Sequence, residues 1–213
     1  MLKRHLAGPV AGALVAAALV TAPIAPANAQ RAAGTDSLAA LLAADGQKLD
    51  KNWKDFDIIE AAVLTVAGAK PETPLLALTN GKKRLTAFAP TDAAFRKLVE
   101  DLTGTAPKSE KATVDAILAT YDVDTIESVL LYHVVAGKTL NSTKVVAAAK
   151  KKQKITMANG AKIRVKLMKG KVVLVDKDKN DRDARAIPKL LDLNKGNRQI
   201  GHGIDRVLRP LNL

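Results

Sequence analysis

One stretch of this sequence alternates strictly between apolar and basic side chains, and it constrains the fold more than any other feature. Residues 163–167 read Ile-Arg-Val-Lys-Leu, which is the period of two of a strand with one buried face. The dipeptides Asn159-Gly160 before it and Lys169-Gly170 after it are typical of tight hairpin turns. We therefore expect three strands joined by two hairpins, over residues 153–158, 161–168 and 171–175.

The first two thirds of the chain have a helical period instead. Asp57-Ile58-Ile59-Glu60 and Asp124-Thr125-Ile126-Glu127 both place a cap acceptor three residues before a Glu, as in a capping box. Thr91, after Pro90, can cap a further helix. We expect helices over residues 37–42, 57–68, 91–99, 114–118 and 124–131, with strands over 85–89 and 198–208. Helices followed by a strand meander predict an α+β fold.

The N-terminus predicts export. A basic head at Lys3 and Arg4 precedes an uncharged apolar stretch over 6–24, and Ala27-Asn28-Ala29 follows. This pattern is typical of a signal peptide, here residues 1–29, cleaved between Ala29 and Gln30. A retained membrane anchor is the alternative, but Gly and Pro residues interrupt the apolar stretch. With no cysteine for lipid attachment and no hydrophobic tail, we expect a secreted, extracellular protein without a permanent membrane anchor.

Cleavage leaves 184 residues, enough for one domain with its own core. We expect an Ala-rich lead-in over residues 30–51, which is either a short helix or a loosely packed arm, and a single domain over 52–213. Because the sequence has no cysteine, an exported domain of this kind depends on packing rather than on disulfides.

The charge balance indicates an anionic partner. The net charge is +13, and +11 without Lys3 and Arg4, which attracts polyanions over a long, salt-sensitive range. Export favours a cell-wall polymer or acidic polysaccharide, and nucleic acid is disfavoured because no aromatic residues lie among the cations. The candidate contacts lie in a stretch from Lys144 to Lys171 that has no acidic residue; they are Lys150, Lys151, Lys152, Lys154, Lys162, Arg164 and Lys166. The alternative is a solvated strand whose lysines prevent edge pairing.

Three separate segments together resemble the fasciclin domain family. Residues 86–95 (TAFAPTDAAF) are similar to its first signature, and residues 130–137 (LLYHVVAG) are similar to its central Tyr-His segment. Residues 203–210 (GIDRVLRP) are similar to its closing signature. The sequence departs from the family at Gly201-His202-Gly203 and in a longer stretch between Val175 and Gly201.

The resemblance implies a compact, wedge- or sandwich-like domain of twisted β-sheets flanked by helices, used in extracellular adhesion and matrix contacts. It also implies that Tyr132 and His133 form an adhesion determinant. The alternative for His133 is a buried imidazole whose hydrogen bonds are satisfied inside the domain.

An acidic run over residues 176–183 invites a test as a calcium site. Asp176, Asp178 and Asn180 match three positions of a calcium-binding loop, but Asp181 stands where the loop needs Gly and Ile187 where it needs Glu. We therefore expect a solvated charged loop here.

The sequence has no local motif for catalysis, a cofactor or zinc. We expect a non-enzymatic adhesion module that contacts an anionic polymer or a surface protein and needs no cofactor, with its oligomeric state left open. The alternative is a small-molecule carrier or enzyme with a pocket near His133 and His202. That alternative requires both histidines to line one cavity.

Overall fold

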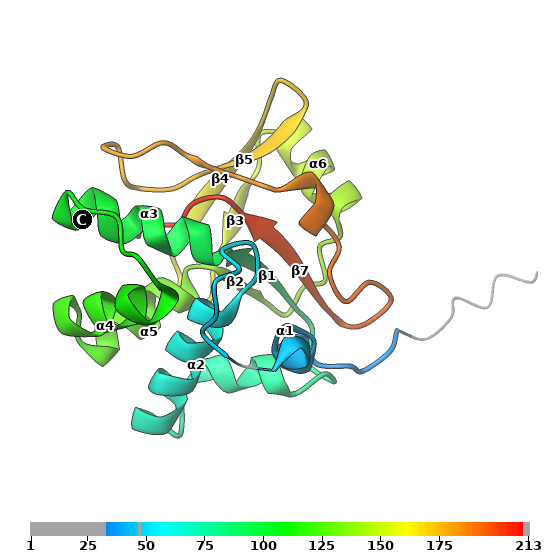
Figure 1. Ribbon diagram of the computed structural model, residues 1–213. Helices are drawn as coiled ribbons and strands as arrows, with labels where there is room; N and C mark the ends of the chain where they lie inside the picture. The colour runs from blue at the N-terminus through cyan, green and yellow to red at the C-terminus, as the bar shows by residue number, and fades with distance from the viewer. Residues whose placement is uncertain (1–32, 47, 211–213) are drawn as a thin grey trace, which may run out of the picture. The chain divides into compact units, whose positions relative to one another are not determined.

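The computed structural model describes residues 33–46 and 48–210, and most of its helices form one layer of the domain. The α-helices are α1 (Leu38–Leu42), α2 (Asp57–Ala69), α3 (Asp92–Thr103), α4 (Glu110–Thr120), α5 (Val123–Leu131) and α6 (Ser142–Lys150). Short 3-10 helices are η1 (Ala43–Asp45), η2 (Pro74–Thr79) and η3 (Pro188–Leu190). Figure 1 shows α2 to α5 grouped on one side of the strands, with α6 on the other.

A three-stranded sheet lies next to this helical layer. Its order is β2-β1-β7, with β1 (Leu85–Pro90) parallel to β7 (Gln199–Ile204) and antiparallel to β2 (Val134–Ala136). All six residues of β1 are buried, because Leu85 and Ala87 pack in the helical core and Phe88 packs in a second core on the other face. Burial on both faces is typical of strands in parallel pairs.

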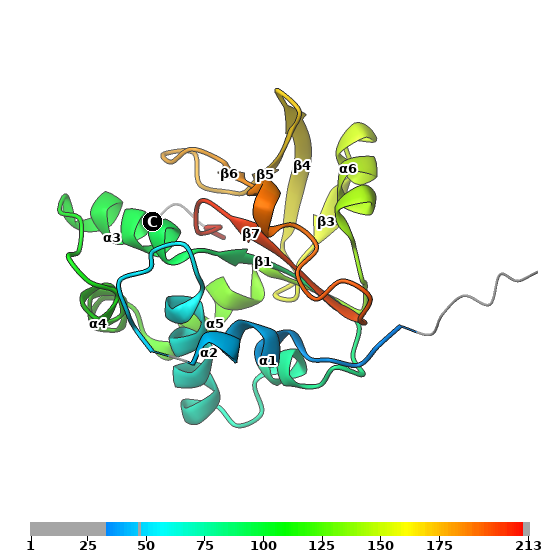
Figure 2. The same ribbon diagram turned by 45° about the vertical axis from the view of Figure 1, so that its right-hand side comes forward.

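The second sheet is the predicted hairpin meander. Its antiparallel order is β3-β4-β5-β6, formed by β3 (Lys154–Thr156), β4 (Lys162–Met168), β5 (Lys171–Val175) and β6 (Ala184–Arg185). The three strands predicted from the alternation are confirmed, and β6 was not expected. Ile163 and Val165 are fully buried in the second core, together with Val145 and Ala149 of α6. Figure 2 shows α6 beside β3 and β4.

The predicted helix caps need two corrections. Asp57 is the first residue of α2 rather than its cap, and the carboxylate of Asp92 accepts from the N–H groups of Asp57 and Ile58, at 3.2 and 2.9 Å. For α5 the capping carboxylate is Asp122, which accepts from the Thr125 N–H at 2.7 Å. In both helices, a carboxylate outside the predicted box accepts from amides of the first turn.

Helix α6 and strand β2 were not predicted. The Asn141 side chain caps α6 by accepting from the Lys144 N–H at 3.0 Å. Only Val145 and Ala149 of this helix are buried. Two buried apolar residues within a run of Ala and Lys give only a weak helical period. The sequence pattern therefore predicted the strands that follow but not this helix.

The lead-in packs against the domain from Gly34 onward. Gly34 forms a bridge with Asn197, and the Leu38 N–H donates to the Gln199 side chain at 2.8 Å. Leu38 is fully buried, and Ser37 caps α1 as expected. None of the helices in residues 33–46 and 48–210 has the length and apolar character needed to cross a bilayer.

Candidate functional site

Tyr132 and His133 follow α5 and are both buried, at 0% and 2% exposed. The His133 Nδ1–H donates to the Val129 carbonyl at 2.7 Å, and Nε2 accepts from the Leu208 N–H at 2.8 Å. Burial lowers the pKa of His133 to about 4 and raises the pKa of Tyr132 to about 12. The imidazole is thus neutral and fully hydrogen-bonded, as the structural alternative requires.

His202 is also buried and satisfied, on a different strand. Its Nε2–H donates to the Leu140 carbonyl at 2.7 Å, and Nδ1 accepts from the Asp192 N–H at 3.2 Å. Its ring packs beside Phe88, with centroids 5.7 Å apart, and burial lowers its pKa. Neither histidine has a free nitrogen for acid-base work.

An apolar cavity of about 330 Å³ lies between α1, α2, η2 and β1. His133 is among the residues that line it, but His202 is not. The rest of the lining is mostly aliphatic and includes Leu42, Val63 and Leu78. The two histidines therefore do not share this cavity, which was the condition for a histidine-based pocket.

The predicted cations lie in two groups. Lys150, Lys151 and Lys152 are exposed at the end of α6, while Lys154, Lys162 and Arg164 are exposed on β3 and β4. Lys166 also lies on β4 but forms an ion pair with Asp183 at 2.9 Å. The register places Lys154 opposite Arg164, and like charges in such cross-strand pairs repel each other.

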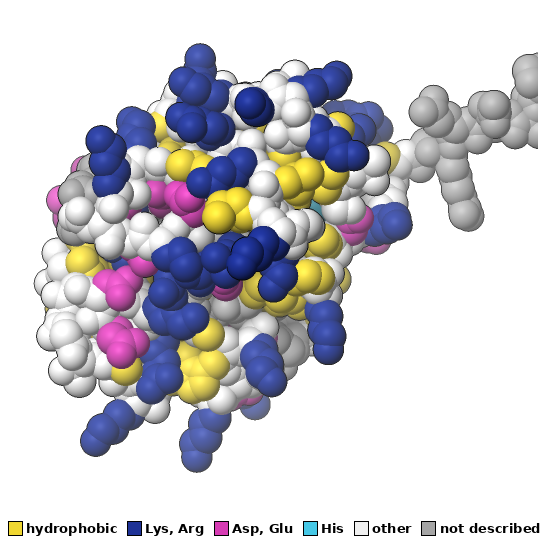
Figure 3. Space-filling view, turned by 90° about the horizontal axis from the view of Figure 1, so that it is seen from above, with side chains coloured by type: hydrophobic (Ala, Val, Ile, Leu, Met, Phe, Trp, Pro, Cys, Tyr) yellow, Lys and Arg dark blue, Asp and Glu magenta, His cyan; other side chains and the backbone are white. Residues whose placement is uncertain are grey.

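A shallow hollow of about 320 Å³ joins the two groups between α6 and the edge strand β3. Its cations are Lys138, Lys144, Lys151 and Lys154, and no acidic side chain lines it. Lys138 was not among the predicted contacts. In Figure 3, the face that carries the β4–β5 hairpin has many Lys and Arg side chains, with Asp and Glu gathered toward one side.

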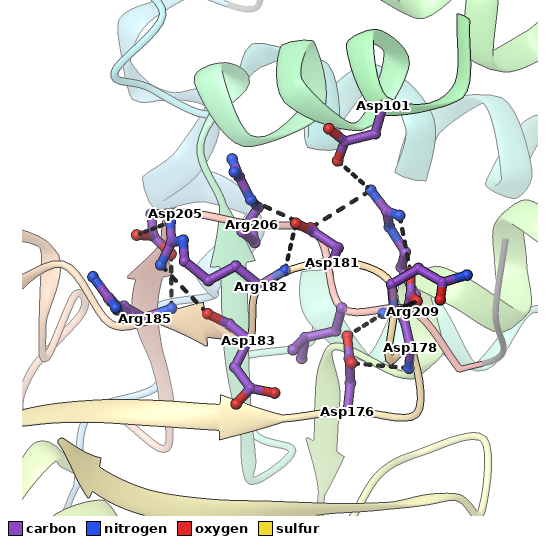
Figure 4. Close-up of polar contacts among 12 residues, drawn as sticks. Asp101, Asp176, Asp178, Asp181, Arg182, Asp183, Arg185, Asp205, Arg206 and Arg209 are labelled. Carbon is purple, nitrogen blue, oxygen red and sulfur yellow. Dashed lines mark hydrogen bonds and ion pairs between the residues drawn. The ribbon is translucent and has the colours of Figure 1, made fainter. Parts of the chain in front are cut away.

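The acidic run over 176–183 is not a solvated loop, contrary to the expectation. Arg209, only 4% exposed, pairs with Asp178 at 2.9 Å and with Asp101 of α3 at 2.7 Å (Figure 4). Asp178 itself is 6% exposed. Arg206 and Arg182 pair with Asp181 and Asp205, so arginines from the end of the domain and from the run itself neutralise these carboxylates.

The comparisons with known proteins identify the fold. The fasciclin domain family matches residues 65–210. The chain belongs to the fasciclin domain family. Seventeen solved chains are similar to it, among them a FAS1 domain pair from the insect cell adhesion molecule fasciclin I, with 18% identity and a TM-score of 0.52. That match covers 72% of this chain and 47% of the other, and curated proteins gave no significant match.

The three fasciclin signatures form one sheet. The first contains most of β1, the central segment contains β2, and the closing signature begins at the end of β7. Strand β1 pairs with both of the others. These signatures therefore specify the centre of the fasciclin fold, and their Tyr, His and Phe side chains are mainly core residues. Fasciclin domains are generally adhesion-related and commonly extracellular modules.

The predicted cleavage site, Ala29 and Gln30, lies outside the described residues.

This fasciclin domain also contains a group of carboxylates that the sequence patterns did not predict: Asp55, Asp92 and Glu110. Burial raises the pKa of Glu110 to about 7, although the nearby Asp50 amide acts in the opposite direction. Burial and the neighbouring Asp55 carboxyl both raise the pKa of Asp92. The available signal was an acidic residue at the start of α2, α3 and α4, of which only Asp57 had an expected role, as a helix cap.

Proposed function

We propose that this fasciclin domain is a secreted, non-enzymatic adhesion module that binds an acidic polysaccharide or anionic cell-wall polymer through its basic face. The basic face is defined as Lys138, Lys144, Lys150, Lys151, Lys152, Lys154, Lys162 and Arg164. The observation that supports it most is the four-lysine hollow between α6 and β3, which no acidic side chain lines.

The argument is electrostatic. Lys154 and Arg164 lie directly opposite each other on neighbouring strands, an arrangement that costs stability unless an anion lies between them. Several cations spaced along an edge strand and a helix end match a repeating charged polymer better than a single small anion. Attraction of this kind is long-ranged and weakens as salt rises.

A charge-reversal variant tests the proposal. Lys150, Lys151, Lys152 and Lys154 are replaced together by Glu, and binding to polygalacturonate is measured at low salt. We expect a loss of at least about ten-fold in affinity, because attraction becomes repulsion at the centre of the face.

The matched control reverses Lys82, Lys83, Arg84 and Lys108, which are exposed and lie outside the basic face. It changes the net charge by the same amount. We expect a much smaller loss from it. Equal losses in the two variants would show a general charge effect and contradict a binding face.

A second candidate function is the carriage of a small apolar molecule in the cavity between α1 and α2. It is supported by the cavity's volume of about 330 Å³ and its aliphatic lining, since small-molecule sites are largely apolar and concave. Replacing Val63 by Phe should fill the space and abolish binding of an apolar fluorescent probe. Unchanged probe binding would contradict this second function.

A further inference from the structure

Three helices of this domain begin with an acidic residue, and those residues are buried. Asp57, Asp92 and Glu110 are the first residues of α2, α3 and α4, and their exposed fractions are 5%, 0% and 0%. The loop before α2 adds Asp55, whose carbonyl accepts from the Asp92 N–H at 3.1 Å. Figure 2 shows this loop passing beside the start of α3 on its way to α2.

The acidic side chains converge on a small volume. One carboxylate oxygen from each of Asp55, Asp92 and Glu110 lies within 4.8 Å of the others. A second trio, Asp50, Asp55 and Asp57, meets the same criterion and shares Asp55. Asp50 is exposed, so the combined group extends from the surface to the buried ends of the helices.

No cation among the described residues explains the burial of Glu110, which has only the Asp50 amide nearby. Among the described residues, neither of its carboxylate oxygens has a hydrogen-bond partner in good geometry, and the same holds for Oδ1 of Asp55. In that part of the chain no Lys or Arg forms an ion pair with Asp55, Asp92 or Glu110. A buried carboxylate without a partner is costly, typically by several kcal/mol.

The helix ends compensate only part of this charge. Each N-terminus contributes roughly half a positive charge, which is less than the full negative charge of one ionised carboxylate such as Asp55 or Glu110. A bound divalent cation would supply the positive charge that the helix ends do not. The acidic run over 176–183 differs, because arginines already pair with it.

We propose that Asp55, Asp92 and Glu110 bind one calcium ion, with Asp50 and Asp57 beside it as further oxygen donors. Hard carboxylate ligands favour Ca²⁺ or Mg²⁺ over zinc or copper. Ca²⁺ binds oxygen at about 2.3–2.6 Å, so opposite ligands lie roughly 5 Å apart, whereas Mg²⁺ requires roughly 4 Å. The oxygens lie within 4.8 Å of one another, a separation that either ion can span, and the flexible coordination of Ca²⁺ suits carboxylates that come from three separate segments better than the strict octahedron of Mg²⁺. Bound calcium would join three helix ends and the loop before α2.

The single tryptophan of the chain gives a direct test. Trp53 lies two residues from Asp55, and its carbonyl accepts from the Ala93 N–H at 2.8 Å. Tb³⁺, a luminescent substitute for Ca²⁺, should therefore be sensitised by exciting Trp53. We expect Tb³⁺ luminescence that CaCl₂ displaces more effectively than MgCl₂, and a Tm that rises with CaCl₂.

The Glu110→Gln variant keeps the side-chain shape and removes one charge. We expect it to weaken Tb³⁺ binding at least about ten-fold, because affinity in such sites follows ligand charge. Asp115→Asn is the matched control, since Asp115 lies on the same helix, is exposed and pairs only with Lys111 in the described residues. If Glu110→Gln does not fold, Asp55→Asn in the loop replaces it.

Three results would overturn the proposal. One is the absence of both Tb³⁺ luminescence and a Tm shift at about 10 mM CaCl₂, well above the range of extracellular calcium sites. Another is equal binding by Glu110→Gln and Asp115→Asn. The third is a Glu110→Gln variant that is more stable than the wild type while CaCl₂ leaves the wild type unchanged, since the group then holds protons rather than an ion.

Discussion

His133 donates one ring proton to the Val129 carbonyl and accepts the Leu208 N–H with its other nitrogen. The imidazole therefore ties the end of α5 to the residues that follow β7. At the scale of single residues, burial and hydrogen bonding separate structural groups such as this one from candidates for binding. Glu110 is a candidate for binding, because both of its carboxylate oxygens are buried without a hydrogen bond in good geometry.

His133 should contribute one defined titration to the pH dependence of stability. Its folded pKa of about 4 is below the unfolded value of about 6.5, so the unfolded state binds more protons between these values. The stabilisation is complete above pH 6.5 and is lost as the pH falls toward 4, by an amount on the order of 3 kcal/mol. Urea unfolding at several pH values measures it.

His133→Gln serves as the comparison. It lowers stability at pH 7 but removes this titration, so its free energy of unfolding should fall less steeply between pH 6.5 and pH 4 than that of the wild type. Parallel slopes for the two proteins would contradict a neutral, buried imidazole.

At the scale of elements, side chains from distant segments decide where helices begin and how loops are held. Asp92 at the start of α3 accepts from the first amides of α2. Arg209, after β7, connects α3 with the acidic run through Asp101 and Asp178. Both contacts join residues far apart in the sequence, and neither could be read from local patterns.

Arg209→Met should destabilise the domain strongly. The variant leaves Asp178 buried without its partner, a change that typically costs about 3–5 kcal/mol. Arg182→Met is the matched control, because its ion pair with Asp205 is partly exposed and worth at most about 1 kcal/mol. Chemical denaturation measures both; similar effects would show that the Arg209 network contributes no more than a surface pair.

Two glycines provide a test of how the lead-in packs. A Cβ on Gly81 would lie 1.7 Å from the Thr35 carbonyl oxygen, whereas one on Gly68 of α2 meets nothing within 4 Å. Gly81→Ala should therefore cost about 1–3 kcal/mol by displacing the lead-in. Gly68→Ala should stabilise by about 0.5–1 kcal/mol through helix propensity. A Gly81→Ala variant as stable as the wild type would mean that residues 34–38 do not pack as described.

At the scale of the whole molecule, periodicity predicted the architecture and missed most of the candidate sites. The alternation over residues 163–167 and its two Gly-containing turns specify β4 and its neighbours, because these signals are local. The α+β class and the fasciclin resemblance are confirmed by the fold and the comparisons. Helix α6 was missed because Val145 and Ala149 alone carry its buried face.

The sites depend on contacts between distant segments. Six of the seven predicted cations are exposed at the end of α6 and on β3 and β4, but the hollow between α6 and β3 also requires Lys138 and Lys144. The carboxylate group brings together Asp55, Asp92 and Glu110 from three parts of the chain, and no spacing rule links them. Sequence patterns identify elements, whereas the three-dimensional arrangement decides which charges meet.

The salt dependence of polymer binding tests the central claim most directly. Purified protein is titrated onto polygalacturonate and onto neutral dextran at about 50 mM and about 300 mM NaCl, which shortens the screening length from about 14 Å to about 6 Å. If the domain is the proposed adhesion module, we expect it to bind polygalacturonate but not dextran. We also expect its affinity for polygalacturonate to fall at least about ten-fold at the higher salt concentration. Equal affinity at both salt concentrations, or equal binding to dextran, would contradict it.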